Sequence, residues 1–386
     1  MGFVASLDMG SEKMVMALGE VSGSECRLVG IESVASQGIH RGMVVDRLRV
    51  KSCVQRLLEK FKQGYEMHID ALNLALAGEW VQQVEDREVS KFSRVKRVEE
   101  ADLQELEKKC RNNVNLEMEE IVDVVPFAYT LDGEPESDPV GCETRRLEID
   151  FHVYVARKRM LEGLRQALNE SGVEKINFYS AVSAAQKALV ARGRKGVRDF
   201  ALIDLGADSI KVHVFQDGMI VYDEVLPLGC NTIEKDINTA FSIENMTSAK
   251  KLKHEYGMAL QAECKSRKIM IPDTKYCIDI QDMVHVEQCR LEELLEGAIW
   301  QILKSGYYKQ LEDGILLTGG GSRVQGIDVL LNRLSKHPIS MASVSTVKSA
   351  KETPLKTPEN FTALGLLRCE RKEPKKRGWF DSFFKE

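Results

Sequence analysis

The feature that most constrains the fold of this chain is a strand–turn–strand pattern that occurs twice. ASLDMGSEKMVMALGEV begins at Ala5, and ALIDLGADSIKVHVFQDG begins at Ala201. In each copy an apolar run leads to Asp, an apolar residue and Gly, and apolar residues then alternate with a period of two, which is typical of a β-hairpin. Asp8 and Asp204 hold the same place in the two copies, 196 residues apart. The repeat predicts two similar α/β lobes that face each other.

The composition of the two turns points to a phosphate ligand. A Gly in such a turn lets the backbone approach a ligand closely. Backbone N–H groups from two facing turns can cradle a polyphosphate, and two carboxylates can hold Mg²⁺ through water. The alternative is a pair of ordinary hairpins with an Asp-x-Gly turn. Two copies in register favour the ligand site over this alternative.

A third glycine-rich turn occurs later, in GILLTGGGSRVQGI, which starts at Gly314. An apolar strand leads into three glycines, and we expect a helix to start at Ser322. A strand, a Gly-rich turn and a helix form a common nucleotide-binding arrangement. The segment is neither a P-loop nor a dinucleotide GxGxxG motif. Alone this is a weak signal, but as the third of three ordered turns it indicates a nucleotide-binding site.

The composition limits the class of protein. The chain has 386 residues, of which 43% are hydrophobic, which suits two or more globular domains. A net charge of −5 gives no general attraction to nucleic acid, so we expect no such partner. Nine scattered cysteines without a CxxC pair, acidic residues near the N-terminus and no apolar run of ~20 residues indicate a cytosolic protein. Any membrane contact should then come from the surface side.

The last printed segment, KKRGWFDSFFKE (375–386), combines a basic run with four aromatics. On a helix these aromatics would share one side, which predicts a short interfacial anchor that meets anionic lipid. One such tail should bind weakly, and several tails on one polymer should bind tightly. Docking into a groove of the protein or of a partner is the alternative. The expected membrane-binding residues are Lys375, Lys376, Arg377, Trp379, Phe380, Phe383 and Phe384.

Two Asp-x-Gly hairpins and a late TGGG turn resemble the superfamily of actin, sugar kinases and DnaK-type chaperones. Within it, nearly the whole chain resembles the FtsA family of bacterial cell-division proteins. Segments 38–61 and 226–257 carry this resemblance, and IVDVVPFAYTLDGEPESDPVGCETRRLEIDFHVY (121–154) is the most specific. The resemblance implies an actin-like ATPase α/β fold with two lobes, each a mixed sheet with flanking helices. It also implies an extra small α+β subdomain in the first lobe.

The resemblance also implies where the parts of the chain divide. The first-lobe core should span 1–85 and 159–196, the extra subdomain 86–158, the second-lobe core 197–230 and 311–345, its outer subdomain 231–310, the return to the first lobe 346–367, a linker 368–377 and an amphipathic membrane-targeting helix 378–386. We expect helices in VEEADLQELEKKCR (98–111), in RMLEGLRQALNESG (159–172) and in TPENFTALGLL (357–367). The last should start with Thr357 as N-cap and Pro358 at its first position.

Site residues follow from the resemblance position by position. Phosphate and Mg²⁺ contacts fall on Asp8, Gly10, Ser11, Lys13, Asp204, Gly206, Ala207, Asp208 and Gly229, with Mg²⁺ held through water by Asp8 and Asp204. Adenosine contacts fall on Lys250, Lys253, Gly319, Gly320, Gly321 and Ser322. Two positions depart from the family: GADS replaces a GGG turn, and Lys250 stands where relatives carry an acid.

No catalytic residue is assigned. Relatives position the attacking water with a Glu or Gln, and Ser180 occupies that place in YSAVSAAQKAL. A hydroxyl is a poor base at neutral pH, and Gln186 belongs to another part of the helix. We therefore expect ATP and Mg²⁺ as cofactors with slow or negligible turnover.

The resemblance implies a function and partners. The expected protein polymerises at the cytoplasmic membrane and anchors the FtsZ ring at the division site, with FtsZ's C-terminal peptide, other divisome proteins, further copies of itself and anionic lipid as partners. Arg290 matches the family's peptide-binding arginine, or it forms an ion pair with Glu287 or Glu293 on its own helix. The alternative functions are an adaptor of a pilus or secretion assembly and an ATP-dependent kinase or chaperone-type enzyme.

Overall fold

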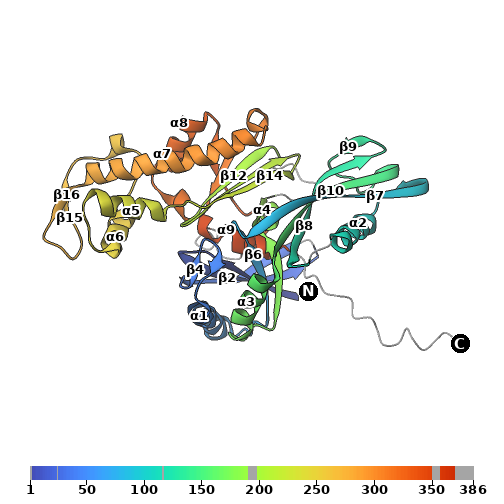
Figure 1. Cartoon of the computed structure of the whole chain (residues 1–386), viewed down its shortest axis with the longest axis horizontal. Helices are drawn as coiled ribbons and strands as arrows, with labels where there is room; N and C mark the ends of the chain where they lie inside the picture. Colours follow the sequence, from blue (N-terminus) through green and yellow to red (C-terminus); the bar gives the residue numbers. More distant parts are fainter. Residues whose placement is uncertain (1, 24, 115–116, 190–197, 350–356, 370–386) are drawn as a thin grey trace.

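The computed structural model describes residues 2–23, 25–114, 117–189, 198–349 and 357–369. Figure 1 shows the first lobe below, the second lobe extending to one side above it, and the extra subdomain on the other side. The expected anchor residues from Lys375 to Phe384 lie outside the described residues.

The first lobe is built on a six-stranded sheet between two pairs of helices. Its strand order is β11 (Lys175–Ser180), β6 (Ala71–Leu76), β1 (Gly2–Met9), β2 (Lys13–Ser22), β3 (Glu25–Ala35) and β19 (Lys348–Ser349). One face packs against α1 (Arg47–Tyr65) and α3 (Lys158–Asn169), and the other against α4 (Ala181–Leu189) and α9 (Phe361–Leu366), as Figure 1 shows for α1 and α9. A two-stranded ribbon of β4 (Ile39–His40) and β5 (Met43–Val44) precedes α1.

The second lobe repeats this plan with a five-stranded sheet. Its order is β14 (Met219–Leu226), β13 (Ile210–Gln216), β12 (Phe200–Leu205), β17 (Ile315–Thr318) and β18 (Ile339–Met341). The predicted hairpins are both present, as β1–β2 and β12–β13. Side chains alternate along β12: Phe200 and Leu202 join the core of the first lobe, while Ala201 and Ile203 join the second core. One face of this sheet therefore lies toward the first lobe.

Helices cover the other face and form the outer subdomain. The longest, α7 (Ile280–Lys304), runs along the second lobe in Figure 1 and packs on α8 (Ile327–Ser335). The outer subdomain adds α5 (Asn231–Ala240), α6 (Met246–Tyr256) and a hairpin of β15 (Lys268–Met270) and β16 (Cys277–Asp279). Short 3₁₀ turns lie at Gln261–Glu263, Tyr308–Gln310, Gly320–Arg323 and Pro358–Asn360.

The extra subdomain is a four-stranded sheet with one helix. The strand order is β7 (Val81–Arg97), β10 (Glu143–Arg157), β8 (Glu119–Leu131) and β9 (Glu134–Glu136), and α2 (Glu100–Asn113) covers one face. The helices predicted in 98–111 and 159–172 are confirmed as α2 and α3. The boundaries between domains stay predictions.

Two predicted helix starts are present as 3₁₀ turns, and the α-helices begin a few residues later. Pro358 opens a 3₁₀ turn rather than an α-helix, and α9 starts only at Phe361. Thr357 has the extended backbone of a cap residue but makes no side-chain cap bond to the turn. After the three glycines the chain likewise makes only a 3₁₀ turn, and α8 starts at Ile327, because Gly326 takes a left-handed backbone conformation with φ 78° and separates the two.

The lobes meet where α4 and α9 cross. Gly365 of α9 lies so close to α4 that a Cβ atom there would sit 2.1 Å from the carbonyl oxygen of Ala184. Both helices are rich in small residues, which allows the backbones to approach. Ser6 of β1 fastens α9 to the sheet, since its hydroxyl donates to the Ala363 carbonyl at 2.6 Å. Because α4 also contacts β14, the crossing lies against the second-lobe sheet as well.

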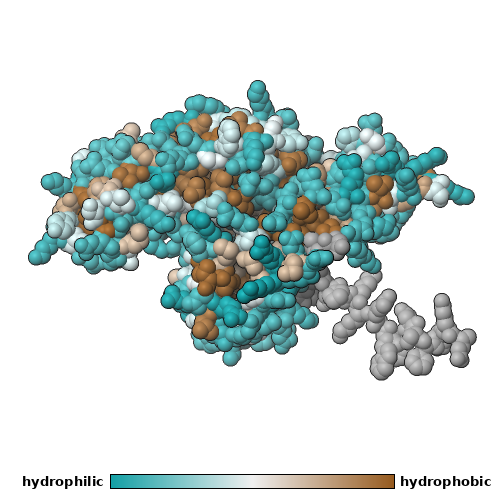
Figure 2. All heavy atoms as spheres, viewed as in Figure 1, coloured by the Kyte–Doolittle hydropathy of each residue, from teal (hydrophilic) through white to brown (hydrophobic). Residues whose placement is uncertain are grey.

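The face shown in Figure 2 is mostly hydrophilic, with scattered hydrophobic patches over both lobes. Among the residues that the structure describes, no helix combines the length and the apolar character that crossing a lipid bilayer requires.

We predict that Gly365→Ala lowers the free energy of unfolding by about 1–3 kcal/mol, because the added methyl overpacks the helix crossing. Denaturant unfolding followed by circular dichroism measures the change. The matched control is Gly163→Ala in α3, where a Cβ would meet nothing within 4 Å and helix propensity should raise stability by up to about 1 kcal/mol. Equal stability of the two variants would show that the crossing is not tight.

Candidate functional site

The two hairpin aspartates point toward the same space between the lobes. Asp204 lies on the face of β12 that carries Phe200 and Leu202, which is the face toward the first lobe. Asp8 lies on the face of β1 that carries Ser6, whose hydroxyl bonds to α9. The structure therefore brings together the two predicted carboxylates, and we call the surrounding residues of both hairpins and the Gly turn the interlobe site.

Lys211 is the residue of this site that sequence reasoning missed. It is directly opposite Asp204 in the β12–β13 pairing, and its Nζ lies 2.5 Å from Asp204 Oδ2. The equivalent partner of Asp8 is Val15, so the internal repeat is broken here. A lysine between two apolar residues at the start of the second strand of the hairpin was the available signal.

Burial and charge set the protonation of Asp8. Burial is the largest cause and raises the pKa of Asp8 to about 6; the Lys211 ammonium opposes this shift, and the Asp204 carboxylate adds to it. For Lys211 burial lowers the pKa, but the two carboxylates outweigh it and raise the pKa above the usual value. The centre of the site thus contains one cation, Lys211, between two acids, Asp8 and Asp204. When both acids are ionised, these three groups carry a net charge of about −1.

The second hairpin turn is compact and is held by backbone bonds. The Gly206 amide donates to the Ser209 carbonyl at 3.0 Å, and the Asn231 amide donates to the Ala207 carbonyl at 2.8 Å. Gly229 packs against this turn, since a Cβ there would lie 2.4 Å from the Ala207 oxygen. These contacts place Gly206, Ala207 and Gly229 together, as the sequence predicted.

Asp208 is turned toward the first lobe. Its carboxylate accepts a hydrogen bond from Asn231 Nδ2 at 2.8 Å and lies 3.1 Å from His40 Nδ1 of β4. Burial alone would raise its pKa, but hydrogen bonds from Asn231 and Ser11 and the His40 charge lower it. The side chain that departs from the family pattern thus has partners of its own in both lobes.

The first hairpin makes further ionic contacts with the second lobe. Glu12 forms an ion pair with Lys250 of α6. Glu359 lies between Lys13 at 3.7 Å and Arg323 at 2.7 Å, and so links the hairpin to the Gly turn. Each of these pairs is partly exposed, so each contributes little alone, about 0–1 kcal/mol. Together they hold the predicted phosphate turn beside the predicted adenosine turn.

The Gly turn lies directly on the second hairpin. Gly319 has φ 84°, and a Cβ there would lie 2.3 Å from Asp204 Oδ1. Gly321 packs against Leu205 and Cys230 in the same way, and Ser322 Oγ bonds back to the Gly319 carbonyl at 2.7 Å. Gly320 differs, because a Cβ there would meet nothing within 4 Å. One glycine of the three therefore faces open space.

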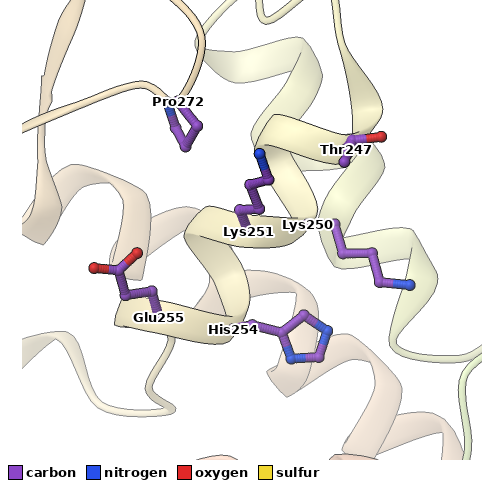
Figure 3. A pocket seen from close by; sticks show the side chains of 6 residues that line it. All are labelled: Thr247, Lys250, Lys251, His254, Glu255 and Pro272. Carbon is purple, nitrogen blue, oxygen red and sulfur yellow. The ribbon is translucent and has the colours of Figure 1, made fainter.

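The two predicted lysines of α6 separate. Lys253 is half-buried, pairs with Glu234 of α5 at 2.6 Å and donates to the Cys230 carbonyl at 3.3 Å. Lys250 instead lines a pocket of about 660 Å³, together with Thr247, Lys251, His254, Glu255 and Pro272. Figure 3 shows Lys250 and His254 extending to one side of α6 and Glu255 to the other. His254, one helical turn after Lys250, is a lining residue that the sequence analysis did not name.

Ser180 has a fully engaged hydroxyl. It donates to Asp123 Oδ2 at 3.1 Å and accepts from the Ser183 amide at 3.2 Å, and the residue is buried. Gln186 points elsewhere and donates to the Gly218 carbonyl at 3.2 Å. Neither side chain is arranged to orient a water molecule. Within the described residues there is also no cluster of three or more His, Cys, Asp or Glu side chains that could hold a metal ion.

Arg290 has one of the partners considered for it and one that was not. It pairs with Glu293 at 2.5 Å and with Asp236 of α5 at 2.5 Å. Glu287 was wrong as a candidate partner, because it lies on the buried face of α7 and accepts from the Met258 amide at 3.1 Å. Burial is the largest cause that raises the pKa of Glu287 to about 8, against the opposing charge of Lys253.

Comparisons with known proteins give a consistent result. The family model described as Cell division protein FtsA matches residues 201–365, and the model described as SHS2 domain inserted in FTSA matches 78–155. Cell division protein FtsA of Bacillus subtilis (strain 168) is 26% identical over 94% of this chain and 82% of its own length. The protein of that name from Escherichia coli (strain K12) is 22% identical over 94% and 89%.

Solved structures share the fold. A PilM–PilN type IV pilus biogenesis complex matches with a TM-score of 0.64 and 18% identity over 94% of this chain and 97% of that one. MreB5 of Spiroplasma citri bound to ADP matches with 0.55 and 13%, over 95% of each chain. A MamK double helical filament matches with 0.53 and 12%, over 95% and 98%. The predicted actin-like fold is confirmed.

We predict that Glu287→Gln changes how stability depends on pH. The folded pKa of about 8 exceeds the ordinary 4.5, so the folded protein holds the extra proton between these values, and wild-type stability falls as pH rises through them. The amide has no such proton. Urea unfolding should show the variant near wild type at pH 5 and about 2–4 kcal/mol more stable at pH 8.5.

The control is Glu293→Gln on the same helix, whose exposed carboxylate pairs with Arg290. It should change stability by less than about 1 kcal/mol at either pH. A Glu287→Gln curve parallel to that of the wild type would contradict the buried, protonated carboxyl.

Proposed function

The chain belongs to the FtsA family of actin-like cell division proteins, and from that premise we propose that it binds ATP with Mg²⁺ at the interlobe site, polymerises, and links FtsZ to the cytoplasmic face of the bacterial membrane at the division site. The observation that carries the nucleotide proposal is the pair of matching hairpins whose aspartates Asp8 and Asp204 face the same space beside the Gly turn. Nucleotide and lipid are steps beyond the family assignment, and each has its own support.

The interlobe site has the groups that a Mg²⁺-nucleotide needs. Backbone amides at the hairpin turns, around Gly10 and Gly206, would bind the phosphates, since Gly allows close backbone approach. Asp8 and Asp204 would hold Mg²⁺ through its waters, and the cation neutralises phosphate charge. Lys211 balances the carboxylates of the site itself. The adenosine would lie between Gly320, which faces open space, and the Lys250–His254 side of α6.

Turnover of the nucleotide should be slow. A general base must reach the proton that it removes, and it needs a pKa near the working pH. Ser180 is buried and both donates and accepts hydrogen bonds within the protein. We propose that ATP acts here as a bound ligand that favours one arrangement of the lobes, with hydrolysis as a rare event. This separates the chain from kinase and chaperone-type enzymes.

The proposed FtsZ contact is Arg290 on the outer subdomain. Its side chain is about one-third exposed and is shared between Asp236 and Glu293. An acidic peptide carboxylate would compete for the same guanidinium, which suits a reversible contact. Alanine at this position would remove the shared cation. We propose FtsZ as the partner because of the family assignment, since the sequence relatives of this chain are named as cell division proteins.

Membrane attachment is proposed for the 375–386 segment on its sequence, with three basic residues before four aromatics. Basic residues contribute about 1 kcal/mol each near anionic lipid, so a single copy binds weakly. A filament would present many copies at once and raise the effective concentration. A solved relative of the same fold forms a double helical filament, which supports self-assembly. A pilus-type adaptor also shares the fold, but the sequence relatives are cell division proteins.

We predict that Gly320→Ala weakens ATP binding at least tenfold and leaves the unfolding midpoint unchanged. The new methyl meets no protein atom, so it should obstruct only a ligand that lies against the turn. Fluorescence titration with a labelled ATP in the presence of Mg²⁺ measures the dissociation constant. Gly64→Ala, at another glycine with no atom within 4 Å, is the control and should bind as the wild type does. Unchanged affinity in Gly320→Ala would remove the adenosine from this turn.

We predict that lipid binding and FtsZ recruitment can be lost separately. On anionic vesicles with ATP, the intact chain should sediment and carry FtsZ with it. A chain ending at Arg377 and Phe383→Asp should both stay in the supernatant, because they lack the apolar side of the anchor. Arg290→Ala should sediment but leave FtsZ behind.

Arg333→Ala is the matched control for the last result. Arg333 of α8 is an exposed cation that pairs with Glu292 of α7, the helix that carries Arg290. It should recruit FtsZ normally. Sedimentation of the shortened chain would refute the anchor, and recruitment by Arg290→Ala would refute the peptide contact.

A further inference from the structure

Strand β8 of the extra subdomain contacts both lobes. It packs beside β11, the outermost strand of the first-lobe sheet, and beside β14, the outermost strand of the second-lobe sheet. Figure 1 shows the extra subdomain reaching the rest of the molecule through this end of β8 and β10. A change in the angle between the lobes must therefore be accommodated at β8.

A buried carboxylate lies at this junction. Asp123 of β8 is only 3% exposed, and its Oδ2 accepts three hydrogen bonds from the first lobe. The donors are the Ser180 amide at 3.0 Å, the Ser180 hydroxyl at 3.1 Å and the Ser183 hydroxyl at 2.6 Å. The other oxygen, Oδ1, accepts from the Val124 amide at 3.0 Å and lies 3.8 Å from Arg111 of α2. Asp123 thus joins two subdomains through a single side chain.

The position of these donors gives the carboxylate its importance. Ser180 is the last residue of β11, and α4 begins at Ala181. The first turn of α4 contains no acidic residue of its own. Ser180 itself caps the helix, since its hydroxyl accepts from the Ser183 amide, and Asp123 orients both serine hydroxyls and supplies, from another subdomain, the negative charge that favours a helix N-terminus. A buried carboxylate is tolerated only with such partners, since without them its desolvation is costly.

The helix that Asp123 holds is connected to both lobes. It crosses α9 at Gly365, and its Gln186 bonds to the Gly218 carbonyl in the second lobe. The strand that leads into α4 is β11, which pairs with β6, and β6 pairs with β1, the strand that carries Asp8. A movement of the lobes on nucleotide binding would shift α4, and Asp123 would carry that shift into β8.

We propose that Asp123 is a positioning residue that couples the interlobe site to the extra subdomain through the N-terminus of α4. The proposal rests on the proposed function, because it needs a nucleotide between the lobes. Asp123 touches no ligand itself. Its role is to make β8 and the β11–α4 junction move together, so that the extra subdomain changes with the nucleotide state.

Hydrogen exchange measured by mass spectrometry on the full chain, with and without ATP and Mg²⁺, tests the coupling. In the wild type ATP should slow exchange both at the β11–α4 junction (175–189) and in β8 (119–131). In Asp123→Asn the junction should still respond, while the ATP-induced change in β8 falls at least threefold. The Asn side chain has one acceptor oxygen and one donor NH₂ group in place of two acceptor oxygens. In either orientation the NH₂ group faces other donors, either the serines or the Val124 amide and Arg111, so some of the hydrogen bonds to Asp123 are lost.

Asp150→Asn is the matched control, because Asp150 belongs to the same sheet and pairs with Arg87 within the extra subdomain. It should keep the wild-type response in β8. Ser183→Ala is a milder second variant, which removes only the shortest of the three bonds and should reduce the response in part. Its use keeps the test valid if Asp123→Asn does not fold.

The outcomes separate the two levels of the proposal. Normal ATP affinity in Asp123→Asn together with a lost β8 response supports a positioning role and excludes a general loss of structure. Normal ATP binding with a full β8 response in both Asp123→Asn and Ser183→Ala overturns the coupling alone. A wild type that binds no ATP in the fluorescence titration overturns the proposed nucleotide function, and the coupling fails with it.

Discussion

The close crossing of α4 and α9 is the constraint on which the rest of the structure depends. At Gly365 the two backbones approach so closely that no side chain fits between them. Both helices lie on the first-lobe sheet, and α4 also contacts β14, so the crossing lies between the sheet that carries Asp8 and the sheet that carries Asp204. Small residues in two short helices therefore set how closely these layers pack.

Charge within that site is arranged in layers. Lys211 lies at the centre beside Asp204, and both carboxylates raise its pKa. Around it, the pairs Glu12–Lys250 and Glu359–Arg323 join the lobes near the surface, where water weakens each pair. The inner cation, which lies between two carboxylates, and the more exposed pairs around it have different roles. The first fixes the local charge of the site, and the second allow the lobes to separate at small cost.

The sequence predicted the features that repeat or that have a strong period. The two hairpins, α2 and α3 follow from patterns confined to neighbouring residues, and the resemblance supplied the arrangement of lobes. The sequence did not predict contacts between segments that lie far apart in the chain. Lys211 was missed because its partner Asp204 becomes visible only when β12 and β13 are paired. The resemblance grouped Lys253 with Lys250, and it did not predict that Lys253 would pair with Glu234 of α5. The Asp123–Ser180 bond joins two subdomains, and no local pattern announces it.

The route of the chain through the first lobe has a consequence for its synthesis. The sheet that begins at Gly2 is completed at its edge by β19 (Lys348–Ser349) and is covered on one face by α9 (Phe361–Leu366). Side chains from the second lobe, including Phe200 and Phe215, also belong to its core. A ribosome therefore releases almost the whole chain before the N-terminal sheet can bury its apolar face. Folding from the N-terminus would leave that face exposed during translation, which favours association with chaperones until the last helix emerges.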